Sequence, residues 1–236
     1  ISTHFAYIEQ PEKMGGYKQR VFDHYPSIQP NIFGLSQGIN NVYQHAGVPY
    51  KNLFLTPNGL DIDAYRFTDK PKYPDRSICI GKIEDRKRQY FLQSIDSLWF
   101  AGNIADNRFN QNKNYLGEIP KSKIKTDLTD YGNLVLVSDG EVHPRVCTEA
   151  LAAGLGIVIS ECGIANLDLD EPFITVIPDS RVDDIEYIES QIIINRDYSI
   201  SHKRDILEYA RQFDWDNIIN QYYIPSINKI RSHYVS

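Results

Sequence analysis

Residues 134–159 read LVLVSDGEVHPRVCTEALAAGLGIVI and combine three structural signals in one short stretch. A continuous apolar run from Leu134 to Val137 predicts a buried strand that ends in a turn. Pro144 suits the first position of a helix, and Gly154 is typical of a helix end. A second apolar run from Ile157 to Ile159 predicts the next strand. A strand, helix and strand in this order are typical of a parallel α/β sheet.

The same alternation extends along most of the chain. Strands are predicted at 32–36, 53–55, 77–80, 99–101, 115–116, 134–137, 157–159 and 173–177, and helices at 37–45, 85–98, 122–128, 144–153 and along the tail from Asp183. This pattern predicts an α/β fold with a doubly wound, Rossmann-like parallel sheet covered on both faces. Ligands of such sheets bind at the carboxyl ends of the strands, which directs attention to loops 81–87, 117–120 and 138–143.

Composition narrows the classes of partner. The chain has 236 residues, 31 acidic and 25 basic, and this net charge of −6 disfavours nucleic acid. The longest apolar run, 150–159, is too short to span a bilayer, although peripheral membrane association stays open. Three cysteines without CxxC spacing and the absence of a signal-peptide pattern favour reduced thiols and a cytoplasmic location. Ordinary dinucleotide and P-loop motifs are missing.

Glu141 and Glu149 stand on either side of the predicted helix start at Pro144. The backbone amides near Val142 and His143 would then lie at a helix N-terminus, where anions bind well. Because carboxylates accept hydrogen bonds from hydroxyl groups, a ligand with both phosphates and hydroxyls fits, which describes a nucleotide sugar. On spacing alone, a surface role for Glu141 and a helix-charge role for Glu149 explain the residues equally well.

A second charged cluster, Gly81 to Arg88, follows the predicted strand 77–80. Its cations would lie at the same sheet edge as Glu141, where they could neutralise a departing diphosphate. A helix start with mixed charges is more often a solvated surface. The cluster therefore indicates a binding site only in combination with Glu141. The Glu141-x-His143 spacing could suit a metal pair, but no third ligand at suitable spacing follows it, and we expect no metal site.

Four segments in this order resemble the retaining GT-B glycosyltransferases of the family 4 type (glycosyl transferases group 1). Glu141 and Glu149, with seven residues between them, match the E-x7-E signature. Residues 56–61, TPNGLD, are similar to the interdomain PNGVD turn of that family, residues 81–87 to its GR…K loop, and residues 213–216, FDWD, to its closing FSW helix. The resemblance runs from about residue 31 to the end of the chain.

This resemblance implies a remnant of an N-terminal, acceptor-side domain at 1–58, the rest of that domain being missing, and a donor-binding GT-B C-terminal domain at 59–236. It also implies roles for eight residues. Lys82 and Lys87 contact the donor diphosphate, Glu141 the sugar, Glu149 the ribose, the amides of Val142 and His143 the sugar or phosphate, and the backbone near Glu118 and Ile119 the base. Lys82, Lys87 and Glu141 are the expected catalytic residues, and no cofactor or obligatory metal is implied.

Three departures from the family pattern affect these roles. Val142 stands where the family usually has glycine, and Pro144 stands where it has a leucine-like residue. Because proline lacks an amide hydrogen, Pro144 cannot donate to a sugar or phosphate oxygen. Lys82 replaces the commoner arginine, which keeps the charge and loses the bidentate fork.

The expected function is transfer of a sugar from a nucleotide sugar to an acceptor hydroxyl with retention, in polysaccharide or glycoconjugate synthesis. The acceptor, whether glycan, lipid or protein, is not specified by the sequence. One alternative is a nucleotide-sugar binding module without turnover, which would follow from a missing N-terminal domain. Another is a different GT-B-type enzyme, such as a sugar-nucleotide epimerase or a phosphorylase. An epimerase would need catalytic acids in the N-terminal half, which are absent here, and no motif for the lysine-bound pyridoxal phosphate of a phosphorylase is visible.

Overall fold

A computed structural model describes residues 2–3, 23–45, 47–111 and 113–235. The chain divides into two compact units, Ile1–Gly59 with Trp215–Ser236, and Leu60–Asp214. The first boundary lies one residue from the one expected at 58/59. The tail from Trp215 groups with the first unit, whereas the family resemblance implies that it belongs to the donor-binding domain at 59–236.

The first unit contains a three-stranded parallel sheet in the order β1-β2-β3. Its strands are β1 (Ser2–Thr3), β2 (Asn31–Gly34) and β3 (Asn52–Leu55). Among the described residues before Gly59 it has the helices α2 (Tyr25–Ile28) and α3 (Gln37–His45). The helix expected at 37–45 is therefore confirmed. Helix α3 follows β2 directly and leads into β3, which is the crossover that a parallel strand pair requires.

The C-terminal helices pack within this first unit. They are α9 (Trp215–Ile218), a π-helical turn (Ile219–Tyr223) and α10 (Ile224–Val235). The ring of Tyr223 stacks on Phe33 of β2, with centroids 6.3 Å apart. A Cβ atom on Gly59 would lie 2.4 Å from the ring of Trp215, so that glycine permits a close approach of the tail. These contacts explain why the tail belongs to the first unit.

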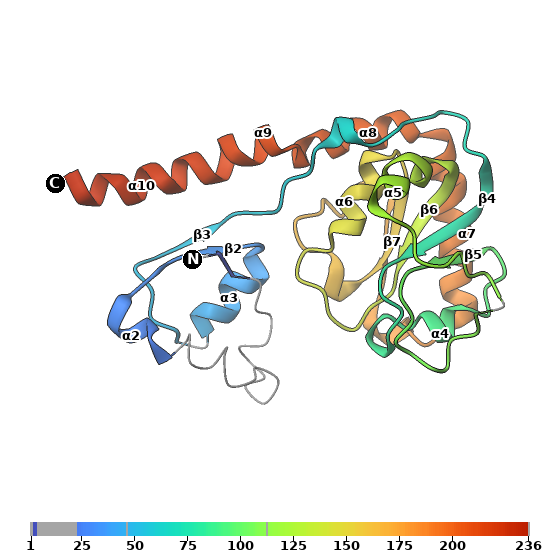
Figure 1. The fold of residues 1–236 in the computed structure, drawn as a ribbon, viewed down its shortest axis with the longest axis horizontal. Helices are drawn as coiled ribbons and strands as arrows, with labels where there is room; N and C mark the ends of the chain where they lie inside the picture. Colours follow the sequence, from blue (N-terminus) through green and yellow to red (C-terminus); the bar gives the residue numbers. More distant parts are fainter. Residues whose placement is uncertain (1, 4–22, 46, 112, 236) are drawn as a thin grey trace. The chain divides into compact units, whose positions relative to one another are not determined.

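The second unit contains a five-stranded, wholly parallel sheet in the order β5-β4-β6-β7-β8 (Figure 1). Its strands are β4 (Tyr73–Ile80), β5 (Leu98–Ala101), β6 (Tyr131–Leu136), β7 (Gly156–Ser160) and β8 (Ile174–Ile177). Its helices are α4 (Gln89–Leu92), α5 (Lys121–Asp127), α6 (Arg145–Ala152), α7 (Ile185–Ser201) and α8 (Lys203–Ala210). All five strands were predicted from apolar runs, and the doubly wound parallel sheet is confirmed.

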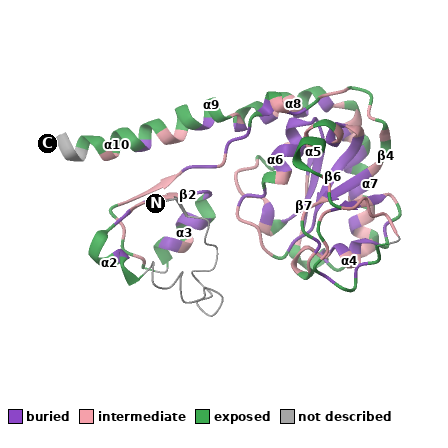
Figure 2. Cartoon of the chain, in the orientation of Figure 1, coloured by how far each residue is buried: buried purple, intermediate pink, exposed green. Residues whose placement is uncertain are grey.

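Side chains alternate between the two faces of this sheet. Leu134 and Leu136 of β6 belong to an apolar cluster with residues of α6 and α8. Val135 and Val137 belong to a second cluster with residues of α4 and α7. Both faces are therefore buried, as the purple strands of Figure 2 show, and this explains the uninterrupted apolar run in the sequence.

The strand order sets the position of the ligand crevice. From β4 the chain crosses to β5 on one side and then returns to β6 on the other side of β4. The crossovers thus diverge at the β4/β6 pair, and the crevice of a doubly wound sheet opens at the carboxyl ends of such a pair. The loops that follow β4 and β6 meet there.

The helix expected at 85–98 is wrong in length. A short 3₁₀ turn (Asp85–Lys87) precedes α4, and Arg88 between them has a left-handed backbone with φ of 52°. Beyond α4, the side chain of Gln93 donates to the carbonyl of Asn110 at 2.6 Å and accepts from its amide at 2.8 Å. Long-range bonds therefore end the helix where local propensity would extend it.

Candidate functional site

The loop after β4 folds tightly against the end of its own strand. Gly81 has φ of 146°, and a Cβ atom there would lie 2.8 Å from Nζ of Lys87. The side chain of Gln89 accepts from the amide of Glu84 at 3.1 Å and donates to the carbonyl of Lys82 at 3.0 Å. This folding brings the Lys87 ammonium back to the sheet edge, where its side chain is only 14% exposed.

The loop after β6 is fixed by β7 and the residues that follow it. The amide of Ser138 donates to Oγ of Ser160 at 2.9 Å, and that hydroxyl donates to the carbonyl of Ser138 at 2.7 Å. The thiol of Cys162 donates to the same carbonyl at 2.8 Å. These bonds hold the backbone that leads to Glu141.

Arg86 joins the two loops. Its Nη1 lies 3.0 Å from Oε1 of Glu141, and its Nη2 lies 2.9 Å from Oε1 of Glu84. The same guanidinium donates to Oγ of Ser138 at 3.2 Å and to the carbonyl of Gly140. The sequence pattern indicates the charged cluster 81–88 but does not single out Arg86. The available signal was an arginine between lysines in a loop that the strand order places opposite Glu141.

The charged side chains in this crevice form ion pairs, and each partner stabilises the charged form of the other. Nζ of Lys87 lies 3.8 Å from Oε1 of Glu141, and Nζ of the exposed Lys82 lies 3.4 Å from Oε2 of Glu84. Burial would raise the pKa of Glu84, but Arg86 and Lys82 outweigh it and hold that pKa below its ordinary value. Burial would lower the pKa of Arg86, but Glu141 and Glu84 raise it above its ordinary value. Both groups are therefore charged at neutral pH.

Glu149 lies at a second place in the crevice. It is 8% exposed on α6, with Nζ of Lys121 at 3.8 Å from its Oε1. Lys121 begins α5 directly after loop 117–120, so Glu149 lies beside that loop rather than beside Arg86. Burial raises the pKa of Tyr65, and the Glu149 carboxylate raises it further. The two glutamates of the E-x7-E pattern therefore contact different residues: Glu141 pairs with Arg86 and Lys87, and Glu149 pairs with Lys121.

His143 and Val142 precede α6, which begins at Arg145 after Pro144 as its N-cap. Val142 is half-buried, and His143 is 7% exposed. Burial, and to a lesser degree Arg145, lowers the pKa of His143 to about 4. The imidazole is therefore neutral at physiological pH. Within residues 23–45, 47–111 and 113–235, no His, Cys, Asp and Glu side chains gather in a group of three that could hold a metal ion.

Loop 117–120 lines a hollow with the β4 loop. Gly81, Lys82, Asn103, Glu118 and Ile119 are among the residues that surround a volume of about 220 Å³. The amide of the Asn103 side chain donates to Oε1 of Glu118 at 2.5 Å. Residues expected to face the diphosphate and the base are therefore brought to one hollow.

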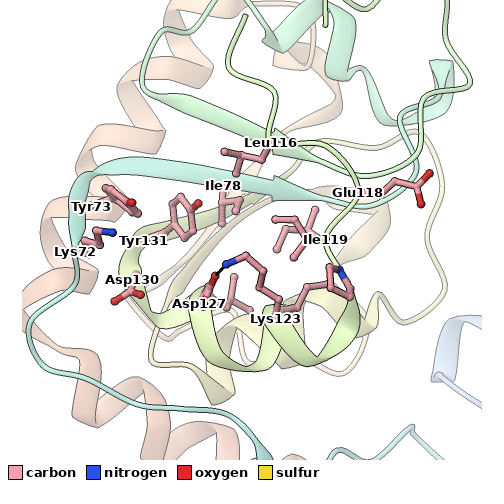
Figure 3. A pocket seen from close by; sticks show the side chains of 14 residues that line it. Lys72, Tyr73, Ile78, Leu116, Glu118, Ile119, Lys123, Asp127, Asp130 and Tyr131 are labelled. Carbon is pink, nitrogen blue, oxygen red and sulfur yellow. Dashed lines mark hydrogen bonds and ion pairs between the residues drawn. The ribbon is translucent and has the colours of Figure 1, made fainter. Parts of the chain in front are cut away.

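A larger cavity of about 440 Å³ adjoins this hollow, with which it shares Ile80, Glu118, Ile119 and Ile124. Figure 3 shows its apolar wall, formed by side chains such as Ile78 and Leu116, and the charged side chains at its rim. Its volume falls within the range of small-molecule sites.

No family model matches the chain, and no curated protein matches it. Solved structures do match. Sucrose-phosphate synthase from Thermosynechococcus elongatus aligns with a TM-score of 0.73 and 15% identity, covering 100% of this chain and 68% of that one. Anabaena HepE in complex with UDP-glucose aligns with a TM-score of 0.73 and 15% identity, covering 98% and 71%. The lipopolysaccharide outer core galactosyltransferase WaaB aligns with a TM-score of 0.66 and 14% identity, covering 84% and 62%.

The chain has the GT-B glycosyltransferase fold. Within this GT-B fold, the second unit supplies the Rossmann-like sheet whose edge carries the residues described above. None of the helices in the described part of the chain combines the length and apolarity that a membrane span needs.

Proposed function

We propose that this chain is the donor-binding portion of a glycosyltransferase that acts on a nucleotide-diphosphate sugar. The observation that carries the proposal is the approach of Lys87 to Glu141 at the β4/β6 switch point, with Lys82 in the same β4 loop and Glu149 and loop 117–120 beside it. Cations suit a diphosphate, carboxylates suit sugar hydroxyls, and a hollow beside both suits a base. The solved complex of HepE with UDP-glucose makes a UDP-sugar the first donor to test.

In the proposed reaction a hydroxyl of the acceptor attacks the anomeric carbon while the bond from that carbon to the diphosphate breaks. The nucleoside diphosphate departs from the same face and takes up the proton of the hydroxyl, so the configuration is retained. Lys82 and Lys87 stabilise the negative charge that develops on the leaving group. Glu141 accepts hydrogen bonds from the sugar and Glu149 from the ribose. The amides of Val142 and His143 face the sugar or phosphate, and the backbone at Glu118 and Ile119 faces the base. No obligatory metal is needed, because the ammonium groups neutralise the diphosphate.

The proposal also covers the biological setting. The acceptor side lies in the first unit, and the reaction serves polysaccharide or glycoconjugate synthesis in the cytoplasm. A hexose is the expected transferred group.

A donor screen tests this function. UDP-, GDP- and dTDP-sugars are added to the chain, and thermal unfolding is followed; a ligand at 100 times its dissociation constant should add about 2.7 kcal/mol of stability. Lys87→Ala and Glu149→Ala should each abolish the stabilisation. Lys113→Ala and Glu208→Ala, which remove charges paired elsewhere with Asp96 and Arg211, are the matched controls and should keep it.

Binding and turnover are separated in a second step. Release of free nucleoside diphosphate in the presence of candidate acceptors indicates transfer, whereas binding without release indicates a binding module. A normal response to all donors in both site variants would contradict the site assignment.

A further inference from the structure

Arg86 connects the two loops of the crevice through both its backbone and its side chain. Its carbonyl accepts from the amide of Asp139 at 2.8 Å, while its guanidinium reaches Glu141. Arg88, two positions further along the same loop, makes a second link between the loops, because its Nε donates to Oδ1 of Asp139 at 2.7 Å. The loop after β4 and the loop after β6 are therefore joined by two arginines, Arg86 and Arg88, of the same loop.

The guanidinium of Arg86 holds two carboxylates with different nitrogens. Nη1 lies 3.0 Å from Oε1 of Glu141, and Nη2 lies 2.9 Å from Oε1 of Glu84. Because the guanidinium is planar and rigid, fixing Glu84 at one nitrogen fixes the direction of the other nitrogen toward Glu141. The side chain of Glu141 is only 15% exposed, so water competes weakly for this contact.

The contact sets the orientation of the Glu141 carboxylate. Arg86 and Lys87 both approach Oε1, at 3.0 Å and 3.8 Å. With Oε1 directed at the two cations, the plane of the carboxylate and the direction of Oε2 are defined. A lysine at position 86 would supply a charge without the second, oriented nitrogen.

We propose that Arg86 is a positioning residue that orients Glu141 toward the sugar of the donor, while the diphosphate is bound by Lys82 and Lys87. This inference rests on the proposed function. Arg86 already bonds Glu84, Glu141, Ser138 and the carbonyl of Gly140, so direct phosphate binding would require it to leave charged partners. Arg86 therefore acts on the sugar through Glu141 and determines how much more tightly a nucleotide sugar binds than the bare nucleotide.

The test compares UDP with UDP-glucose by calorimetry on the full chain, or the nucleotide pair that the donor screen selects. Arg86→Gln should leave the dissociation constant for UDP within about threefold and weaken UDP-glucose roughly tenfold, since a hydrogen bond to a charged group has about this effect. Arg86→Lys should restore only part of the difference. Arg108→Gln, at an arginine paired with Asp85 and Asp106, is the matched control and should change neither constant.

A double-mutant comparison separates positioning from a general structural role. In the Glu141→Gln background, Arg86→Gln should add no further loss for UDP-glucose, because its route to the sugar is already gone. Thermal unfolding without ligand verifies that each variant is folded.

Three outcomes would overturn the positioning role. Equal losses for UDP and UDP-glucose would assign Arg86 to the diphosphate or to loop folding alone. Unchanged constants for both ligands would remove its role, and additive losses in the double variant would show that it does not act through Glu141. A wild-type chain that binds no nucleotide or nucleotide sugar contradicts the proposed function itself, and the role of Arg86 falls with it.

Discussion

At the scale of single residues, His143 shows how burial changes side-chain chemistry at the edge of the crevice. Its pKa is lowered to about 4, first by burial and then by Arg145, whereas an unfolded chain has a histidine pKa near 6.5. Between these values the unfolded chain binds the proton more tightly. Stability of the second unit should therefore be full above about pH 6.5 and fall as the pH drops toward 4, by on the order of 3 kcal/mol from this residue.

His143→Gln should flatten this pH dependence. Denaturant unfolding at several pH values between 4 and 7 measures it, with Trp99 of β5 as the fluorescent reporter of the second unit in a Trp215→Phe background. His45→Gln, at an exposed position of the first unit, is the control and should retain the slope. The same slope in His143→Gln as in the parent would refute the burial argument.

At the scale of elements, α7 shows what an apolar pattern leaves undecided. Ile188 and Ile192 are buried, whereas Ile193 and Ile194 are exposed on the same helix. Isoleucines thus occur on both faces, and the sequence does not indicate which face packs on the sheet. The buried face is the one that carries Asn195, whose side-chain amide donates hydrogen bonds to the carbonyls of Ile157 in β7 and of Phe173 just before β8.

Asn195→Leu should destabilise the second unit by at least about 2 kcal/mol, because several buried groups lose their partner. Its Nδ2 donates to the carbonyl of Phe173 at 2.9 Å and to Oγ1 of Thr175 at 3.0 Å, and its Oδ1 accepts from Nδ2 of Asn133 at 2.9 Å. Denaturant unfolding measures the change. Asp197→Leu, on the exposed face of α7, should stay within about 0.5 kcal/mol. Similar losses in both variants would mean that the bonds of Asn195 contribute little.

At the scale of the whole molecule, the chain divides into two units, and we expect the donor to bind to the second. Hydrogen exchange with and without UDP-glucose should show protection of residues 82–88, 117–120 and 141–149, all in the second unit. Strands β2 and β3 of the first unit should change less, because the residues proposed to bind the donor lie outside them. Protection confined to the first unit would contradict the assignment of the donor site.

The sequence by itself located the strands of the larger sheet and the candidate residues of this protein. Apolar runs predicted all five strands of the larger sheet, because a parallel strand that is buried on both faces carries consecutive apolar residues through its buried part. The turn and helix signals around Pro144 placed Glu141 and Glu149 at a strand's carboxyl end. These are local properties, encoded within about 25 residues.

Only the tertiary structure decided which elements and side chains contact one another. Arg86 and Glu141 are 55 positions apart and come together because the strand order sets β4 beside β6. Gln93 ends α4 through bonds to residues beyond β5, and Tyr223 draws the tail to the first unit through Phe33. Local periodicity records which faces are apolar. It does not record which surface each face will contact, because that choice depends on the packing of the whole chain.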